Sequence, residues 1–334
     1  MKLKDGLSRL FTIYGTALIL MFFSEYFFLN EEPVQDVMKI MSAAEEASIL
    51  GYVEFTLFYT LFAVWLLLPI FYFKIRRFWA LYLAGGFFGI ATEGVVIPLI
   101  YTESLTWPAL SWHVLADVIL GWYVVRHVLI KNQPLYTVLL AVAMGLFWAF
   151  WAPWTHIGEE PFIPEPSRFT GFALFASASL FCGYIILNLL HEKQFAPTRI
   201  ELGVFGVITL ALWVPMLINA WFPMLAAKPV NSLLLPLYLG VSLYTLWRHS
   251  KVETREDLFS VFRSKIAWWN ILLLTLMPIT AISAYPLVYR NQLYPPTAPI
   301  VSLMNTSAYV LTVIAVFMLW RDIKKGDAKQ VIKA

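Results

Sequence analysis

The sequence predicts an all-α, polytopic integral membrane protein with about ten transmembrane helices and both termini in the cytoplasm. Three observations support this class. Of the 334 residues 60% are apolar and only 13% are charged, against about 25% charged in ordinary soluble domains. Runs of about 20 apolar residues, each long enough to cross a hydrocarbon core of about 30 Å, recur along the chain. Positive charge alternates between successive connections. The composition excludes a water-soluble globular protein.

The hydropathy pattern places the predicted spans at regular intervals from the first to the last tenth of the chain. Each span is bounded by charged, proline-containing or otherwise polar connections. The predicted spans are Leu10–Leu29, Gly51–Phe73, Phe78–Tyr101, Pro108–Ile130, Pro134–Thr155, Phe169–Leu190, Ile200–Phe222, Val230–Trp247, Ala267–Leu287 and Ile300–Trp320.

The distribution of Lys and Arg predicts the orientation, because cytoplasmic connections retain positive charge. Of the 24 Lys and Arg residues, 20 lie at the two termini or in every second connection. A missed or extra span would destroy this alternation, so the charges test the span count independently of hydropathy. The other four, in the opposite connections, are Lys39, Arg168, Lys228 and Arg290.

The short connections leave no room for a soluble domain, so residues 1–334 are predicted to form a single transmembrane domain. The longest outer connection, an outer amphipathic loop at residues 31–50, has apolar residues such as Val34, Val37 and Met41 at helical spacing. This spacing predicts a short amphipathic helix on the outer membrane surface, or else a solvated loop over it.

Residues 248–266 form a basic inner loop that carries five Lys or Arg residues and three acidic residues. Such a segment is expected to lie against the anionic lipids of the cytoplasmic leaflet, so membrane lipids are expected partners. The topology accounts for the positive charge, and no basic surface with interleaved aromatic residues lies outside the spans. Nucleic-acid binding is therefore not expected.

Four acidic residues lie within predicted spans: Glu25, Glu54, Glu93 and Asp117. An ionisable residue in a span costs about 2.5–3.5 kcal/mol on insertion scales, so it normally faces a partner or a cavity and is a candidate functional residue. With His113, these acids fall roughly 5 to 14 Å below the outer surface in the predicted orientation. The pattern predicts one polar site in the extracytoplasmic half of the bilayer.

His113 and Asp117 are four residues apart, on one helix face, and Glu93 falls at a similar depth on the adjacent antiparallel span. We therefore predict Glu93, His113 and Asp117 as catalytic residues. The same three side chains are the predicted ligands of a divalent metal ion such as zinc, which would activate a water molecule. Without a metal, a carboxyl group and His113 would act as general acid and base. The alternative interpretation is a structural hydrogen-bonded pair between helices.

Four further residues are predicted to bind substrate: Glu25, Trp112, Trp154 and His156. Glu25 lies near the outer end of the first span, and Trp112 adjoins His113. Trp154 and His156 belong to an outer tryptophan-rich segment, residues 148–156, which would form an aromatic wall for a lipid-like substrate. Tryptophans at this depth also form ordinary interfacial belts, which is the alternative interpretation.

These residues predict a membrane-embedded enzyme, a hydrolase or transferase, that acts on a lipid-like or membrane-borne substrate in a prokaryotic plasma membrane. The first alternative is a proton- or cation-coupled transporter, in which the buried carboxylates would relay protons. The second alternative is a non-catalytic membrane subunit, in which polar networks only fix helix packing. The sequence does not define the substrate or the oligomeric state.

Overall fold

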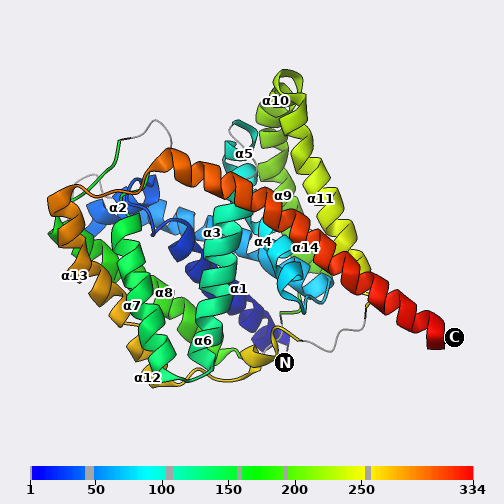
Figure 1. Cartoon of the computed structure of the whole chain (residues 1–334), viewed down its shortest axis with the longest axis horizontal. Helices are drawn as coiled ribbons and strands as arrows, with labels where there is room; N and C mark the ends of the chain where they lie inside the picture. Colours follow the sequence, from blue (N-terminus) through cyan, green and yellow to red (C-terminus); the bar gives the residue numbers. More distant parts are fainter. Residues whose placement is uncertain are drawn as a thin grey trace. The chain divides into compact units, whose positions relative to one another are not determined.

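A computed structural model describes residues 2–41, 49–102, 108–155, 160–191, 195–252 and 257–333. All regular secondary structure in these ranges is helical, and they contain no β-strand. Figure 1 shows the order of the helices along the chain. The elements are α1 (Lys2–Ser24), α2 (Glu32–Met41), α3 (Ile49–Tyr72), α4 (Phe78–Ala91), η1 (Thr92–Val96), α5 (Leu99–Thr102), η2 (Pro108–Val125), α6 (Arg126–Ile130), α7 (Pro134–Trp151), α8 (Pro166–Leu189), α9 (Arg199–Met216), η3 (Leu217–Trp221), α10 (Phe222–Ala227), α11 (Pro229–His249), η4 (Ser260–Arg263), α12 (Trp268–Leu273), α13 (Leu276–Asn291) and α14 (Thr297–Lys333).

Ten helical segments of the described residues are long and apolar enough to cross a membrane, which confirms the predicted number. The fourth, Pro108–Ile130, has the predicted bounds, and it consists of η2 followed directly by α6. These helices indicate an integral membrane protein. The cytoplasmic location of the termini stays a prediction.

The first helix ends five residues earlier than predicted, at Ser24. The Glu25 N–H still donates to the Met21 carbonyl at 3.0 Å, but the Leu29 N–H donates to the carbonyl of Ala152 at 2.8 Å. The indole N–H of Trp148 also donates to the Tyr26 carbonyl, at 2.8 Å. These bonds satisfy the backbone outside a helix, so the apolar residues after Glu25 form a buried turn.

The third predicted span, Phe78–Tyr101, is interrupted before its end. The α-helix α4 passes into the π-helical turn η1, and Ile97 is then extended, with φ −115° and ψ 153°. Pro98 explains this break, because a residue that precedes proline is sterically excluded from the helical region. The short helix α5 follows.

The chain divides into two compact units, each built from three separate segments. Unit 1 contains Met1–Thr60, Leu120–Lys193 and Val261–Val301, and unit 2 contains Leu61–Ile119, Gln194–Ser260 and Ser302–Ala334.

Unit 1 is built on two helix pairs, α1 with α8 and α7 with α13. A Cβ atom on Gly183 would lie 2.9 Å from the carbonyl oxygen of Gly15, so these glycines let α1 and α8 approach at backbone distance. In the connection between α1 and α3, α2 is helical as its apolar spacing indicates, and Val34, Val37 and Met38 are buried. Residues 42–48 lie outside the described part.

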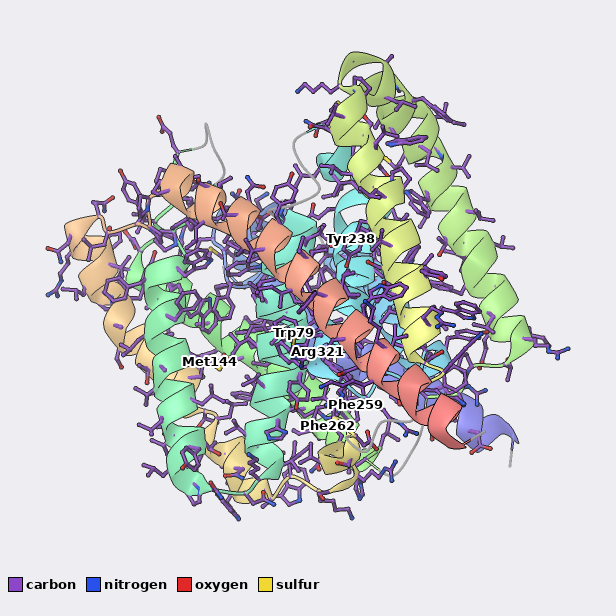
Figure 2. The ribbon with its side chains drawn as sticks, turned by 45° about the vertical axis from the view of Figure 1, so that its right-hand side comes forward. Trp79, Met144, Tyr238, Phe259, Phe262 and Arg321 are labelled. Atoms are coloured by element: carbon purple, nitrogen blue, oxygen red, sulfur yellow. The ribbon has the colours of Figure 1, made fainter. Side chains whose placement is uncertain are left out.

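Unit 2 places α4 directly against the start of η2. A Cβ atom on Gly89 would lie 2.8 Å from the Cα of Ala109, so only glycine permits this approach. The hydroxyl of Tyr82 donates to the Leu110 carbonyl at 2.9 Å. From α11, the hydroxyl of Tyr238 donates to the Leu83 carbonyl at 3.0 Å (Figure 2). Helices α9 and α11 are joined through η3 and α10, and α10 lies at the tip of this pair (Figure 1).

The basic loop at residues 248–266 begins with the last two residues of α11 and contains one short helical turn, η4; its other described residues are irregular. Residues 253–256 lie outside the described part. The loop is attached to unit 2 by the Leu258 N–H, which donates to the Arg76 carbonyl at 3.0 Å.

Candidate functional site

Three of the predicted site residues form a hydrogen-bonded chain inside unit 2, the Glu93–His113–Asp117 triad. The Nδ1 atom of His113 lies 2.7 Å from Oδ2 of Asp117, and its Nε2 atom lies 2.5 Å from Oε1 of Glu93. The imidazole thus bridges two carboxyl groups that come from neighbouring helical elements.

Both elements that carry the triad are π-helical. Glu93 lies on η1, and His113 and Asp117 lie on η2. Such segments widen the helix and occur frequently at functional sites. The four-residue spacing keeps His113 and Asp117 on one face, as predicted from the sequence.

The turn that carries Glu93 is fixed by its neighbours. The hydroxyl of Tyr101 donates to the Gly94 carbonyl at 2.9 Å, and the indole N–H of Trp213 donates to the Tyr101 oxygen at 2.7 Å. A Cβ atom on Gly94 would lie 2.9 Å from Cγ1 of Ile100, so glycine allows α5 to fold back on η1. The orientation of Glu93 therefore depends on α5 and α9.

Burial decreases along the triad from Asp117 to Glu93. The side chains of Asp117, His113 and Glu93 are 0%, 5% and 12% exposed. The Phe88 ring meets the imidazole edge to face, with ring centroids 5.7 Å apart. Glu93 is therefore the most exposed member of the triad.

The second carboxyl oxygen of Glu93 differs from the first. Oε2 is buried and has no hydrogen-bond partner among the described residues. A buried carboxylate oxygen without a partner is unfavourable, so a proton or a ligand donor at this atom would stabilise the site.

The arrangement supports proton transfer. Asp117 holds the imidazole in one orientation, and the imidazole can exchange a proton with Glu93 through a bond that already exists. The carboxyl group of Glu93, hydrogen-bonded to an oriented imidazole, can therefore act as a general acid or base.

The structure gives no support to the predicted metal ion. Both imidazole nitrogens bond to carboxyl groups, so in this arrangement neither presents a lone pair to a cation. The described ranges contain no group of three or more His, Cys, Asp or Glu residues arranged to hold a metal ion.

Glu25 lies in unit 1, whereas the triad lies in unit 2. The hydroxyl of Tyr59 donates to Oε1 of Glu25, and the Ser24 hydroxyl donates to the same oxygen at 3.3 Å. The sequence does not predict Tyr59 as a partner, because a tyrosine within a predominantly apolar span gives no signal of its own.

The predicted aromatic substrate residues are buried. Trp112, next to His113, is 8% exposed. Trp154, in unit 1, packs among aromatic rings and stacks on Trp151 with ring centroids 5.7 Å apart. His156 lies outside the described residues. Glu54, the fourth acid of the predicted spans, is exposed.

The fold and the site together define a helical protein of the membrane-spanning type with a buried carboxyl–imidazole–carboxyl triad. Comparisons with protein-family models, curated proteins and solved structures gave no match. Function is therefore argued from the triad.

Proposed function

We propose that this protein is a membrane-embedded enzyme that catalyses hydrolysis or group transfer on a lipid-like or membrane-borne substrate. Glu93 is the proton donor and acceptor, His113 exchanges protons with it, and Asp117 orients His113. The observation that carries the proposal is the continuous chain of bonds from Asp117 through the imidazole to Glu93.

The gradient of burial supports this division of roles. A group that only positions another can be fully enclosed, as Asp117 is, whereas a group that meets substrate must be reachable, as Glu93 partly is. A structural network would be expected to satisfy every polar atom, whereas Oε2 of Glu93 has no hydrogen-bond partner in the described part of the chain.

The surroundings support a membrane-borne substrate. Both elements of the triad belong to segments that are apolar enough to lie in a bilayer. The Phe88 ring contacts His113 of the triad, and Trp112 precedes His113 in the sequence. Both side chains are apolar and buried. A lipid-like molecule can reach such a site from the bilayer, whereas a polar solute would need an aqueous path.

The proposed location is the extracytoplasmic half of the membrane, which follows from the charge alternation of the connections. Trp112, which adjoins His113 in the sequence, is proposed to contact substrate there. A divalent ion remains an optional part of the proposal, and it would have to displace a carboxyl group from His113.

The test uses the full chain purified in nanodiscs that contain total lipid of the organism that encodes it. Mass spectrometry follows the lipids with time for the wild type, Glu93→Gln, Asp117→Asn and the exposed control Glu54→Gln. We expect one lipid class to change mass with the wild type and Glu54→Gln only. Metal analysis of the same samples decides whether an ion accompanies activity. Unchanged conversion by Glu93→Gln would contradict the proposal.

Proton-coupled transport is the second candidate function, favoured by the two carboxyl groups and one imidazole of the triad, which can store and release protons within the membrane. Its test is the dissipation of a pH gradient in proteoliposomes, followed with an enclosed pH-sensitive dye. Proton flux that disappears in Glu93→Gln, without any lipid conversion, would favour transport. Neither activity in the wild type would favour a non-catalytic subunit.

A further inference from the structure

Arg126 is a buried cation in unit 1 that takes no part in the triad of unit 2. It is the first residue of α6 and is only 8% exposed. It lies four residues before Ile130, where the fourth membrane-type helix ends, and thus about 6 Å along the axis from that end. The side chain is therefore close to one membrane boundary.

The contacts of Arg126 are aromatic rather than ionic. Its guanidinium carbon lies 4.1 Å from the centroid of the Phe262 ring and 5.9 Å from that of Trp122. Among the described residues it makes no hydrogen bond or ion pair. A guanidinium group has five N–H donors, and stacking on a ring satisfies none of them.

A buried charge without a counter-ion is costly, and attraction to an aromatic face offsets only part of that cost. The surrounding groups do not supply the missing anion. Tyr184, the nearest ionisable neighbour on α8, uses its hydroxyl to donate to the Gly121 carbonyl at 2.8 Å. The described residues therefore supply no counter-ion to Arg126.

The aromatic partners are held in place by other bonds. Asn188 exchanges two bonds with the backbone of Ile266, at 2.7 and 3.0 Å, and the Ala267 N–H donates to the Asn132 side chain at 2.9 Å. These bonds anchor the segment that begins at Phe262, which is labelled in Figure 2. The Trp122 indole N–H donates to the Thr16 hydroxyl at 3.3 Å. The rings are thus positioned without Arg126.

Further positive residues lie near the same end of the helix. Arg263 and Lys265 belong to the anchored segment, and Lys131 follows the last residue of α6; all three are exposed. The Asn132 side-chain N–H₂ donates to the Lys265 carbonyl at 3.3 Å, which keeps that residue beside the helix end. The surroundings are therefore cationic, and they attract anions.

From these observations we infer that Arg126, Phe262 and Trp122 form a binding site for a phosphate oxyanion. The planar guanidinium group matches two phosphate oxygens, and the position near a membrane boundary suits a phospholipid headgroup. Free phosphate has the same chemistry, and the experiment distinguishes the two sources.

The experiment is native mass spectrometry of the full chain in detergent, titrated separately with phosphatidylglycerol, phosphatidylcholine and inorganic phosphate. The variants are Arg126→Met, which retains the apolar stem against Phe262, and the exposed control Arg199→Gln. We expect a preferred phosphatidylglycerol adduct in the wild type and in Arg199→Gln. In Arg126→Met this preference should fall about tenfold, the loss expected for one charge-assisted contact.

The other outcomes are decisive in either direction. Competition by inorganic phosphate at low concentration, with no lipid preference, would identify free phosphate as the ligand. An unchanged lipid preference in Arg126→Met, or equal binding of all three probes by the wild type, would overturn the inference.

A second measurement on the unaltered chain covers the case in which Arg126→Met does not fold. Hydrogen–deuterium exchange of residues 125–130 and 261–266 is compared in phosphatidylcholine nanodiscs with and without phosphatidylglycerol. The anionic lipid should slow exchange in both segments. Equal exchange in the two kinds of nanodisc, together with equal exchange with and without added inorganic phosphate, would overturn the inference.

Discussion

The Nε2 atom of His113 lies 2.5 Å from Oε1 of Glu93, although the two residues are separated by twenty positions and a break at Pro98. The contact exists because η1 turns back on α5 and because Gly89 lets α4 meet the start of η2 at backbone distance. Geometry at this contact is therefore sensitive to residues that never touch a substrate.

The first prediction concerns the accessible end of the triad. Glu93→Gln keeps the size of the side chain but removes the exchangeable proton, so catalysis should fall by about 10²–10⁴-fold. The measurement is lipid conversion in nanodiscs, with Glu54→Gln as the matched acid-to-amide control. Equal loss in both variants would mean that neither effect is specific to the triad.

The second prediction concerns the enclosed end. Asp117→Asn should lower activity by a similar factor, because an amide can donate to Nδ1 and stabilise the wrong imidazole tautomer. Asp117→Ala should in addition lower the free energy of unfolding by about 1–3 kcal/mol, because His113 would lose a buried partner. Thermal unfolding in the same detergent measures this loss. Full activity in Asp117→Asn would refute an orienting role.

The third prediction concerns the support of Glu93. Tyr101→Phe leaves the buried Gly94 carbonyl and the Trp213 indole N–H without their common partner, which should cost about 1–3 kcal/mol of stability. Tyr136→Phe, at an exposed position of α7, is the control and should change stability by less than about 0.5 kcal/mol. The expected order of thermal midpoints is wild type and Tyr136→Phe together, then Tyr101→Phe.

The fourth prediction concerns helix contact in unit 2. Gly89→Ala places a methyl group against the Ala109 backbone, so the variant should fail to fold or lose several kcal/mol of stability. Gly206→Ala on α9 adds a methyl group to open space, and it should be neutral or slightly stabilising. Yield of monodisperse protein and thermal unfolding report both effects. A well-folded Gly89→Ala protein would show that α4 and η2 can separate.

The fifth prediction concerns orientation. Alkaline phosphatase fused after Lys333 should be inactive and a fluorescent protein fused there should be bright, because the last connection carries cytoplasmic positive charge. A fusion within the connection between α13 and α14 should show the reverse. The opposite pattern would place the triad in the cytoplasmic half of the bilayer.

Hydropathy and charge predict the helical class and the ten spans because apolar length is a local property of the chain. The contact between His113 and Asp117 follows from their spacing alone, and the position of Glu93 follows from depth in an adjacent helix. The end of α1 at Ser24 was not predictable, because Phe27 and Phe28 continue the apolar run and only tertiary bonds to α7 remove them from the helix.

The residues that bond to the buried acids or support their backbone could not be predicted for a related reason. Tyr59 and Tyr101 lie among apolar residues, and a tyrosine there is equally consistent with simple packing. In the sequence, Arg126 is only one of the 20 positive residues that predict the orientation. Its aromatic surroundings come from Phe262, more than a hundred residues later in the chain. Long-range contacts of this kind leave no periodic signal.

The three-segment construction of each unit also constrains biogenesis. Unit 1 is complete only when residues as late as Val301 have left the ribosome, and unit 2 needs residues beyond Ser302. Early helices must therefore remain in the translocon or the lipid until the later segments that complete their unit have been synthesised. A nascent chain arrested before the last helix would be a substrate for membrane proteases rather than a smaller working protein.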